Sequence, residues 1–269
     1  MCVAGIDVGS LTAKALILDG AAVRSQAVIR ARAHPADSAE AVMRQALDRA
    51  GLPRRELAFC MGTGYGKDQI AFADGVASEI TCHARGAWWH APDTRTVIDI
   101  GGQDAKAIRL DADGRVIRYA YNDKCASGTG RFLEIMADAL EVELEAMGRV
   151  GAQAAETLSI SNQCVIFAET EVVSLVNEGR AVADIVDALH RAMANRVAAL
   201  ARGIGIANDV TMTGGVAKKS GVFTALAAGL DTDLKALTAV DPQVNGALGA
   251  ALLAAEAVSG RAPEREAAF

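Results

Sequence analysis

The chain has 269 residues, a length that corresponds to one large domain or two smaller ones. Its residues are 51% hydrophobic but only 4% aromatic, a balance typical of the aliphatic core of an α/β enzyme. The formal net charge of −6 argues against a nucleic-acid-binding surface, because phosphate neutralisation requires clustered Lys and Arg. Five cysteines do not make a disulfide framework in a chain of this length. We find neither a signal peptide nor an apolar run long enough to span a membrane, and we therefore expect a cytoplasmic protein.

The first thirty residues are predicted to form a meander of three strands, the first of which ends at Asp7. A buried carboxylate is costly unless it serves a cation or accepts hydrogen bonds. Donors for phosphate oxygens and a positive charge follow in the turn and the second strand: Gly9, Ser10, Thr12 and Lys14. An ordinary hairpin turn uses the same residue types, so this segment alone leaves both interpretations open.

The segment that follows, up to about residue 95, is interpreted as structural. A helix is predicted over residues 37–50 and a short strand over residues 57–61. The glycine-rich loop over residues 62–67 lacks the Walker spacing and the dinucleotide fingerprint, which favours a turn over a phosphate-binding loop. Three cysteines and two histidines are interpreted as packed or incidental side chains rather than ligands: Cys2, Cys60, Cys82, His83 and His90.

A second meander begins near Val97 and repeats the first. An apolar strand ends at Asp99, a glycine turn follows, and further strands are predicted over residues 107–110 and 116–121. A duplication of this kind places two acidic glycine turns opposite one another across a cleft. Gln103 and Asp104 are candidates for orienting or deprotonating an attacking water, a role that such groups take in phosphoryl transfer.

Two cysteines, Cys125 and Cys164, are each predicted to lie at the start of a helix. Cys125 follows a strand and stands beside Gly128 and Gly130, and Cys164 precedes a helical run over residues 166–176. The unpaired N–H groups of a helix N-terminus favour an anion such as a thiolate. A lone cysteine of this kind is usually a small buried residue in a turn, but two in equivalent settings form half of a metal site.

The last third of the chain is predicted to hold two helices and a glycine turn. The helix over residues 181–204 is amphipathic and is interpreted as part of the core. A buried strand then runs into Gly214 and Gly215, whose lack of side chains lets the backbone approach a flat ligand such as a nucleoside. The final helix begins near Asn245 with small residues, which predicts close packing against another helix.

Together these motifs resemble those of the actin, sugar-kinase and heat-shock ATPase superfamily. Two phosphate motifs, an adenosine motif and two connecting motifs correspond to residues 6–14, 97–106, 210–217, 126–130 and 246–251. The resemblance implies an α/β fold of two RNase H-like subdomains with a nucleotide cleft between them, each a mixed sheet with a β-β-β meander and flanking helices. The implied subdomains are residues 1–92 and 93–269, with the helix near residues 243–258 packing back on the first.

Within that superfamily the chain closely resembles the activator ATPases of 2-hydroxyacyl-CoA dehydratases and, more broadly, the ATPase subunits of benzoyl-CoA reductases. The resemblance covers about residues 3–258 and is carried by residues 97–104, 122–132, 164–169 and 212–216. Ser127 is a small departure, since many members have alanine there. The paired cysteine motifs are specific, because a sugar kinase or a chaperone ATPase has no use for both.

The resemblance implies a homodimer in which Cys125 and Cys164 of each subunit hold one shared [4Fe-4S] cluster. It implies that ATP hydrolysis, by domain closure, drives one electron from a reduced ferredoxin or flavodoxin on to a 2-hydroxyacyl-CoA dehydratase. Asp7 and Asp99 would position Mg²⁺, and Gln103 and Asp104 would position the attacking water. The other residues implied in binding ATP or ADP are Gly9, Ser10, Thr12, Lys14, Gly101, Gly102, Gly128, Thr129, Gly214, Gly215 and Val216.

Three alternatives stay open at this point. The chain could be the ATPase component of a benzoyl-CoA reductase that pairs with a sister ATPase chain instead of with itself. It could be a small-molecule kinase of the same superfamily with structural cysteines, which would tolerate serine at both positions. It could also be a nucleotide-sensing module without turnover.

Overall fold

The computed structural model describes residues 1–161 and 164–260, which form two compact units. The first unit comprises residues 1–94, residues 110–116 and the chain from residue 237 onward, and the second comprises residues 95–109 and 117–236. The chain therefore passes between the units more than once. Asn162 and Gln163, which precede Cys164, lie outside the described residues, as do residues 261–269.

The first unit is built on a five-stranded sheet in the order β3-β2-β1-β4-β5. The strand β1 pairs antiparallel with β2 and parallel with β4, so the sheet is mixed. Its elements are β1 (Cys2–Val8), β2 (Thr12–Asp19), β3 (Ala22–Arg30), β4 (Cys60–Thr63), β5 (Gly75–Val76), α1 (Pro35–Ala50), α2 (Glu79–His90) and α8 (Asn245–Val258). The predicted meander is confirmed as β1, β2 and β3.

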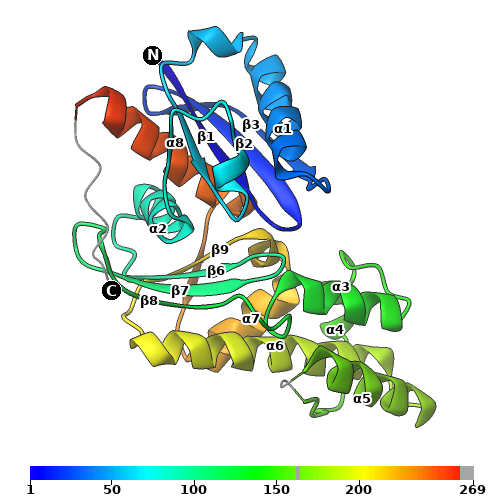
Figure 1. The fold of residues 1–269 in the computed structure, drawn as a ribbon. Coiled ribbons are helices and arrows are strands. Elements are labelled where there is room, and N and C mark those ends of the chain that lie inside the picture. Colours follow the sequence, from blue (N-terminus) through cyan, green and yellow to red (C-terminus); the bar gives the residue numbers. More distant parts are fainter. Residues whose placement is uncertain (162–163, 261–269) are drawn as a thin grey trace. The chain divides into compact units, whose positions relative to one another are not determined.

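Both faces of β1 are buried, and its residues alternate between two cores. Ala4 and Ile6 join the cluster that contains α1, whereas Val3 joins the cluster that contains α8. This alternation is the period of two that a strand imposes on its side chains. In Figure 1, α1 accordingly covers one face of the sheet and α8 the other.

The prediction that α8 packs closely through its small residues is confirmed. A Cβ atom added to Gly249 would lie 1.8 Å from the carbonyl oxygen of Cys82 in α2. A Cβ atom on Gly5 of β1 would lie 2.0 Å from the carbonyl oxygen of Ala247 in α8. Because real Cβ atoms do not approach backbone atoms so closely, only glycine fits at these two crossings.

The second unit repeats the arrangement with the sheet order β10-β9-β6-β7-β8. The strand β6 pairs antiparallel with β7 and parallel with β9, as β1 does with β2 and β4. The predicted α/β fold of two similar subdomains, each with a mixed sheet, is confirmed. The elements are β6 (Thr96–Ile100), β7 (Ala105–Leu110), β8 (Val116–Asn122), β9 (Val210–Thr213), β10 (Leu234–Ala236), α3 (Gly130–Ala139), α4 (Met147–Gly151), α5 (Val165–Asn177), α6 (Val182–Ile204) and α7 (Ser220–Leu230).

The core of the second unit lies between its sheet and its helices. Ile98 and Ile100 of β6 pack in one cluster with Leu189, Met193 and Val197 of α6. These α6 residues follow the helical spacing that predicted a core helix, and the prediction is confirmed. None of the helices in the described residues combines the length and the apolar character that crossing a bilayer requires.

Candidate functional site

Asp7 lies at the end of β1 and is 4% exposed. Its Oδ2 atom is 3.0 Å from the Nζ atom of Lys14, which stands directly opposite on β2. The carbonyl of Thr12 accepts a hydrogen bond of 3.1 Å from the N–H of Gly9, which closes the turn between the strands. Lys14 therefore neutralises the buried carboxylate and also lies beside the turn, since its Nζ atom would be 3.1 Å from a Cβ atom on Gly9.

Two further segments of the first unit approach Asp7. Gly64, in the glycine-rich loop after β4, has a φ of +93° and leaves no room for a side chain, because its Cβ atom would lie 2.5 Å from Asp7 Oδ1. Gly246, at the start of α8, would place a Cβ atom 2.9 Å from Asp7 Oδ2 and 3.1 Å from His83 Nε2. The loop after β4 is thus a turn that packs against Asp7.

Asp99 occupies the equivalent place at the end of β6 and is 2% exposed. Its Oδ1 atom accepts a hydrogen bond of 2.8 Å from the hydroxyl of Thr213 on β9, and its Oδ2 atom is 3.6 Å from the Nζ atom of Lys106. The same ammonium is 2.6 Å from Asp104 Oδ2. Two carboxylates of the second unit are therefore held by one buried lysine. Gln103, between them in the turn, is exposed.

The predicted phosphate, connecting and adenosine segments of the second unit converge at the end of β6. The N–H groups of Gly130 and Arg131 donate to the carbonyls of Gly101 and Gly102 at 2.9 Å and 2.8 Å. Gly214 has a φ of +86°, and a Cβ atom there would lie 2.3 Å from the carbonyl oxygen of Ile100. The structure therefore brings together Asp99, Gly101, Gly102, Gly214 and the start of α3.

The remaining predicted residues lie in the same two turns or next to them. Ser10 is exposed in the turn of the first unit, and Thr12 begins β2. In the second unit Thr129 is the N-cap residue of α3, and its hydroxyl donates to the carbonyl of Ala126 at 2.7 Å. Gly215 begins a short 3₁₀ helix, Gly215–Lys218, in which Val216 is buried.

Of the two predicted metal-site cysteines, Cys164 begins a helix, as predicted, and is the N-cap residue of α5. Cys125 lies between β8 and α3, at the predicted strand-to-helix junction, but it precedes the N-cap residue Thr129 and does not begin the helix. The first two N–H groups of α3 are already bonded to the carbonyls of residues 101 and 102. The helix N-terminus is thus engaged by the neighbouring loop, and the side chain of Asn122 holds the turn by donating to the carbonyls of Cys125 and Ser127.

The five cysteines, all of which the structure describes, divide by exposure. Cys2, Cys60 and Cys82 are buried, whereas Cys125 and Cys164 are partly exposed, and none of these five described residues forms a disulfide. Burial raises the pKa of the Cys60 thiol to about 12, which keeps it protonated and unreactive. In the described residues no group of three or more His, Cys, Asp or Glu side chains is placed to hold a metal ion.

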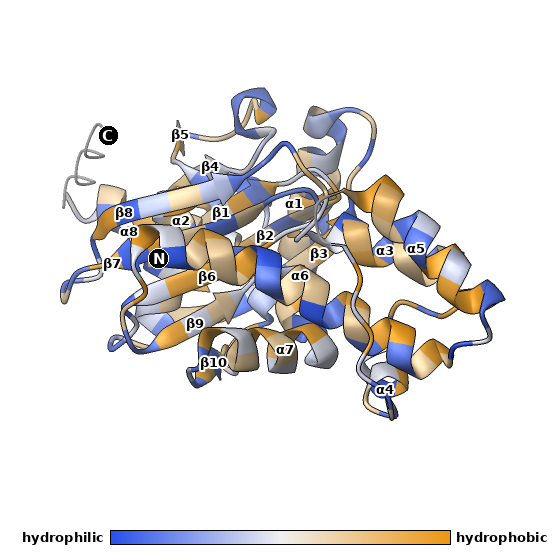
Figure 2. Ribbon diagram, turned by 90° about the horizontal axis from the view of Figure 1, so that it is seen from below, coloured by the Kyte–Doolittle hydropathy of each residue, from blue (hydrophilic) through white to orange (hydrophobic). Residues whose placement is uncertain are grey.

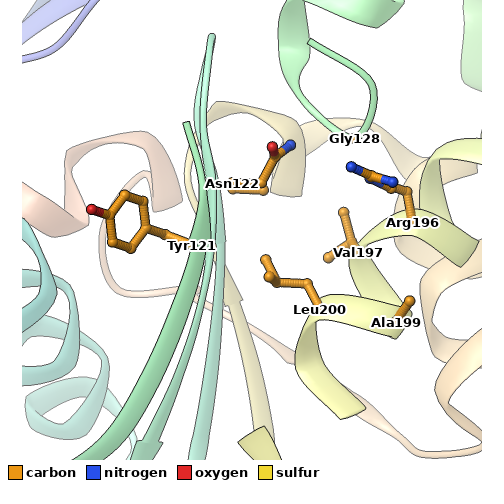
Figure 3. A pocket seen from close by; sticks show the side chains of 8 residues that line it. Tyr121, Asn122, Gly128, Arg196, Val197, Ala199 and Leu200 are labelled. Carbon is orange, nitrogen blue, oxygen red and sulfur yellow. The ribbon is translucent and has the colours of Figure 1, made fainter. Parts of the chain in front are cut away.

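A cavity of about 320 Å³ lies beside the Cys125 turn, between α6 and the neighbouring strands. Figure 3 shows Val197, Leu200 and Arg196 projecting from α6 toward it, with Gly128 in the turn above. A Cβ atom on Gly128, which has a φ of +89°, would lie 3.0 Å from Arg196 Cγ. The structure describes every residue implied in nucleotide binding, and among these only Gly128 lines the cavity.

Sequence reasoning did not place next to the predicted acids four polar side chains that contact or adjoin them. Thr213 and Lys106 hold Asp99, and His83 and Asn245 form a buried pair next to Asp7. Lys106 could have been found from the repeat, because it occupies the same position after Asp99 as Lys14 does after Asp7. Thr213 carries no such local signal.

A family model described as the BadF/BadG/BcrA/BcrD ATPase family matches residues 4–254. The activator of lactoyl-CoA dehydratase from Anaerotignum propionicum is 45% identical over 254 residues, covering 94% of this chain and 97% of that protein. One of the subunits of benzoyl-CoA reductase from Thauera aromatica is 33% identical over 259 residues, covering 93% and 91%.

Solved structures show the same similarity. The activator of 2-hydroxyisocaproyl-CoA dehydratase from Clostridium difficile, solved with bound ADPNP, superposes with a TM-score of 0.91 at 38% identity, and each chain is covered completely. A ROK family glucokinase from Streptomyces griseus superposes with a TM-score of 0.58 at 14% identity, covering 95% of this chain and 100% of the glucokinase. The second likeness shows the fold alone, that of the sugar kinases.

Proposed function

The chain belongs to the BadF/BadG/BcrA/BcrD ATPase family, and on this premise we propose that it is an ATP-dependent electron donor that activates a 2-hydroxyacyl-CoA dehydratase. The observation that carries the proposal is the exposure of two cysteines in one unit. Cys125 and Cys164 are partly exposed, and both belong to the second unit. The relatives with the highest identity given above are activators of such dehydratases. We further propose that it works in the cytoplasm, where ATP is available.

A [4Fe-4S] cluster fits these residues if two copies of the chain share it. A cubane cluster requires about four thiolates, and one chain offers two partly exposed thiols. Cys125 and Cys164 of each copy would hold the cluster, which when bound would supply a centre that takes up and releases one electron. Asn122 would fix the backbone on both sides of Cys125, and α5 would carry Cys164 at its N-cap.

The apolar surface next to Cys164 supports a homodimer. Ile166 and Phe167, in the first turn of α5, are each 65% exposed, and Val173 further along the helix is 50% exposed. Orange bands, which mark hydrophobic residues, run along α5 in Figure 2. Large exposed apolar side chains in one place are typical of an interaction surface, and a second copy would cover them at the site that needs its two cysteines.

Each unit carries one turn that would bind phosphate or a cation. Mg²⁺ prefers oxygen ligands, and Asp7, Asp99 and Asp104 provide carboxylate oxygens at the ends of strands. The glycine turns after β1 and β6, with Ser10, Thr12 and Lys14, would bind phosphates, and the turn at Gly214–Val216 would carry the adenosine. Gln103, which is exposed, would orient the attacking water together with Asp104.

Iron analysis after strictly anaerobic purification tests the proposal. We expect about four irons per dimer, and their loss in Cys125→Ser and in Cys164→Ser. Cys60→Ala is the matched control, because the buried Cys60 thiol is not a candidate ligand, and it should keep the iron. With ATP and reduced ferredoxin or flavodoxin, the iron-loaded protein should start turnover of a 2-hydroxyacyl-CoA dehydratase. Iron-free dimers, or dehydratase turnover without ATP, would contradict the proposal.

A second candidate is the ATPase component of a benzoyl-CoA reductase, favoured by the 33% identity to the Thauera aromatica protein. Such a component would pair with a sister ATPase chain. Native mass measurement separates the two functions, because an activator should give a cluster-bearing dimer of this chain alone, whereas a reductase component should bind a full cluster only with its sister chain.

A further inference from the structure

The two acidic turns share a pattern of eight residues that fixes a lysine opposite each aspartate. Residues 7–14 read Asp-Val-Gly-Ser-Leu-Thr-Ala-Lys, and residues 99–106 read Asp-Ile-Gly-Gly-Gln-Asp-Ala-Lys. The strand register pairs Asp7 with Lys14 and Asp99 with Lys106. The same hydrogen bond closes both turns, from Gly9 to the Thr12 carbonyl and from Gly101 to the Asp104 carbonyl.

The two turns differ in charge at one position. Where the first has Thr12, the second has Asp104, whose Oδ2 atom is 2.6 Å from Lys106 Nζ. The lysine of the first unit faces one carboxylate, that of Asp7. The lysine of the second unit faces two, those of Asp99 and Asp104.

Burial makes this arrangement costly to disturb. Lys106 is 5% exposed and Asp99 is 2% exposed, so neither charge is stabilised by bulk water. An ammonium supplies three donors and no acceptor, and it can hold two carboxylates at once. Without it, the two acids would repel one another beside β6.

We propose that Lys106 competes with the cation: its ammonium neutralises Asp99 and Asp104 until a cation enters and weakens its contact with Asp104. This inference rests on the proposed ATPase site. A cation that takes Asp104 Oδ2 as a ligand competes with the ammonium there, because both contacts use the same oxygen atom. An ammonium that loses this contact is then available for a phosphate oxygen.

Binding of Mn²⁺, followed by electron paramagnetic resonance without nucleotide, tests this role directly. Lys106→Met should bind Mn²⁺ about tenfold more tightly than the wild type, because a competing positive charge is gone. Lys106→Arg keeps the charge and should bind within about twofold of the wild type. Lys235→Met is the matched control, because Lys235 pairs with Asp209, which is not a proposed cation ligand, and it should leave the Mn²⁺ affinity within about twofold.

Thermal unfolding provides a second readout that a merely structural lysine would not give. Lys106→Met should melt below the wild type in chelator and recover when Mn²⁺ is added, since the cation takes over the neutralising role. Weaker or unchanged Mn²⁺ binding in Lys106→Met, or equally tight binding in Lys106→Met and Lys235→Met, would overturn the proposal. Neither measurement needs iron or a dehydratase, so its failure is distinct from failure of the proposed electron transfer.

Discussion

Replacing Thr213 by valine removes one hydroxyl group and keeps the shape of the side chain. That hydroxyl donates the 2.8 Å hydrogen bond to Asp99 Oδ1, and both residues are buried. Valine cannot donate, so one oxygen of a buried carboxylate would lose its partner. A polar group left unsatisfied in this way costs its full desolvation penalty.

The first unit offers a matched substitution. Thr63 on β4 stands opposite Asp7 in the strand register, as Thr213 on β9 stands opposite Asp99. Its hydroxyl, however, donates to the carbonyl of Ala77 at 3.0 Å and not to the aspartate. Thr63→Val therefore removes a neutral hydrogen bond at an equivalent, fully buried position.

The two substitutions should differ in their effect on stability, because only the hydrogen bond of Thr213 is made to a charged group. Thr213→Val should lower the free energy of unfolding by about 2 kcal/mol and Thr63→Val by about 1 kcal/mol. Thr213→Val should also slow ATP hydrolysis, since Asp99 loses a contact that fixes its orientation, whereas Thr63→Val should leave the hydrolysis rate close to that of the wild type.

Urea unfolding followed by circular dichroism measures the first quantity, and phosphate release measures the second. Equal losses of stability in the two variants, or unchanged phosphate release in Thr213→Val, would show that the hydrogen bond to Asp99 does not hold the carboxylate as the structure indicates.

Three further substitutions or conditions have expected outcomes. Gly249→Ala should lower the free energy of unfolding by at least about 3 kcal/mol, because the new Cβ atom would meet the carbonyl oxygen of Cys82. Gly203→Ala on α6, where a Cβ atom would meet no other atom, should raise the free energy of unfolding by about 0.5–1 kcal/mol. Urea unfolding measures both changes. Burial lowers the pKa of His190, so its contribution to stability is present above the unfolded value near 6.5 and is lost as the pH falls below it. Unfolding measured between pH 8 and pH 5 should show that decline, and His190→Gln should flatten it. The Cys60 thiol, with a pKa of about 12, should resist iodoacetamide at pH 8 until the protein is unfolded, as peptide mass analysis would show.

Local patterns predicted most of the secondary structure and the acidic turns. The alternation in β1 and the helical spacing in α6 each specify a face, and the repeat of Asp-x-Gly after an apolar strand specifies where each carboxylate stands. These features depend on residues close together in the sequence. The strand predicted over residues 57–61 begins later, at Cys60, because the preceding residues pair with β1 only through isolated hydrogen bonds from Ala58 and to Phe59.

The partners of the carboxylates depend on contacts between distant segments and were not predictable from local sequence. Thr213 meets Asp99 only because β9 lies parallel to β6 in one particular register. Thr63 has the same register against Asp7 and yet bonds elsewhere, so even the repeat does not reveal the difference. The partners of the first N–H groups of α3 were not predictable for the same reason, since they are the carbonyls of residues 101 and 102.

That same contact links the proposed nucleotide turn of the second unit, at Gly101 and Gly102, to the turn that carries Cys125. The carbonyls of Gly101 and Gly102 accept from Gly130 and Arg131, and Asn122 ties the backbone of Cys125 into the turn just before α3. A phosphate or cation that shifts Gly101 must either break two hydrogen bonds or carry the start of α3 with it. A ligand shifts an equilibrium between two conformations only by its difference in affinity for them. The strength of these two hydrogen bonds therefore sets an upper limit on the effect that a bound nucleotide can have on the turn that carries Cys125. At about 1 kcal/mol each, they allow an effect of about tenfold to thirtyfold within the second unit alone.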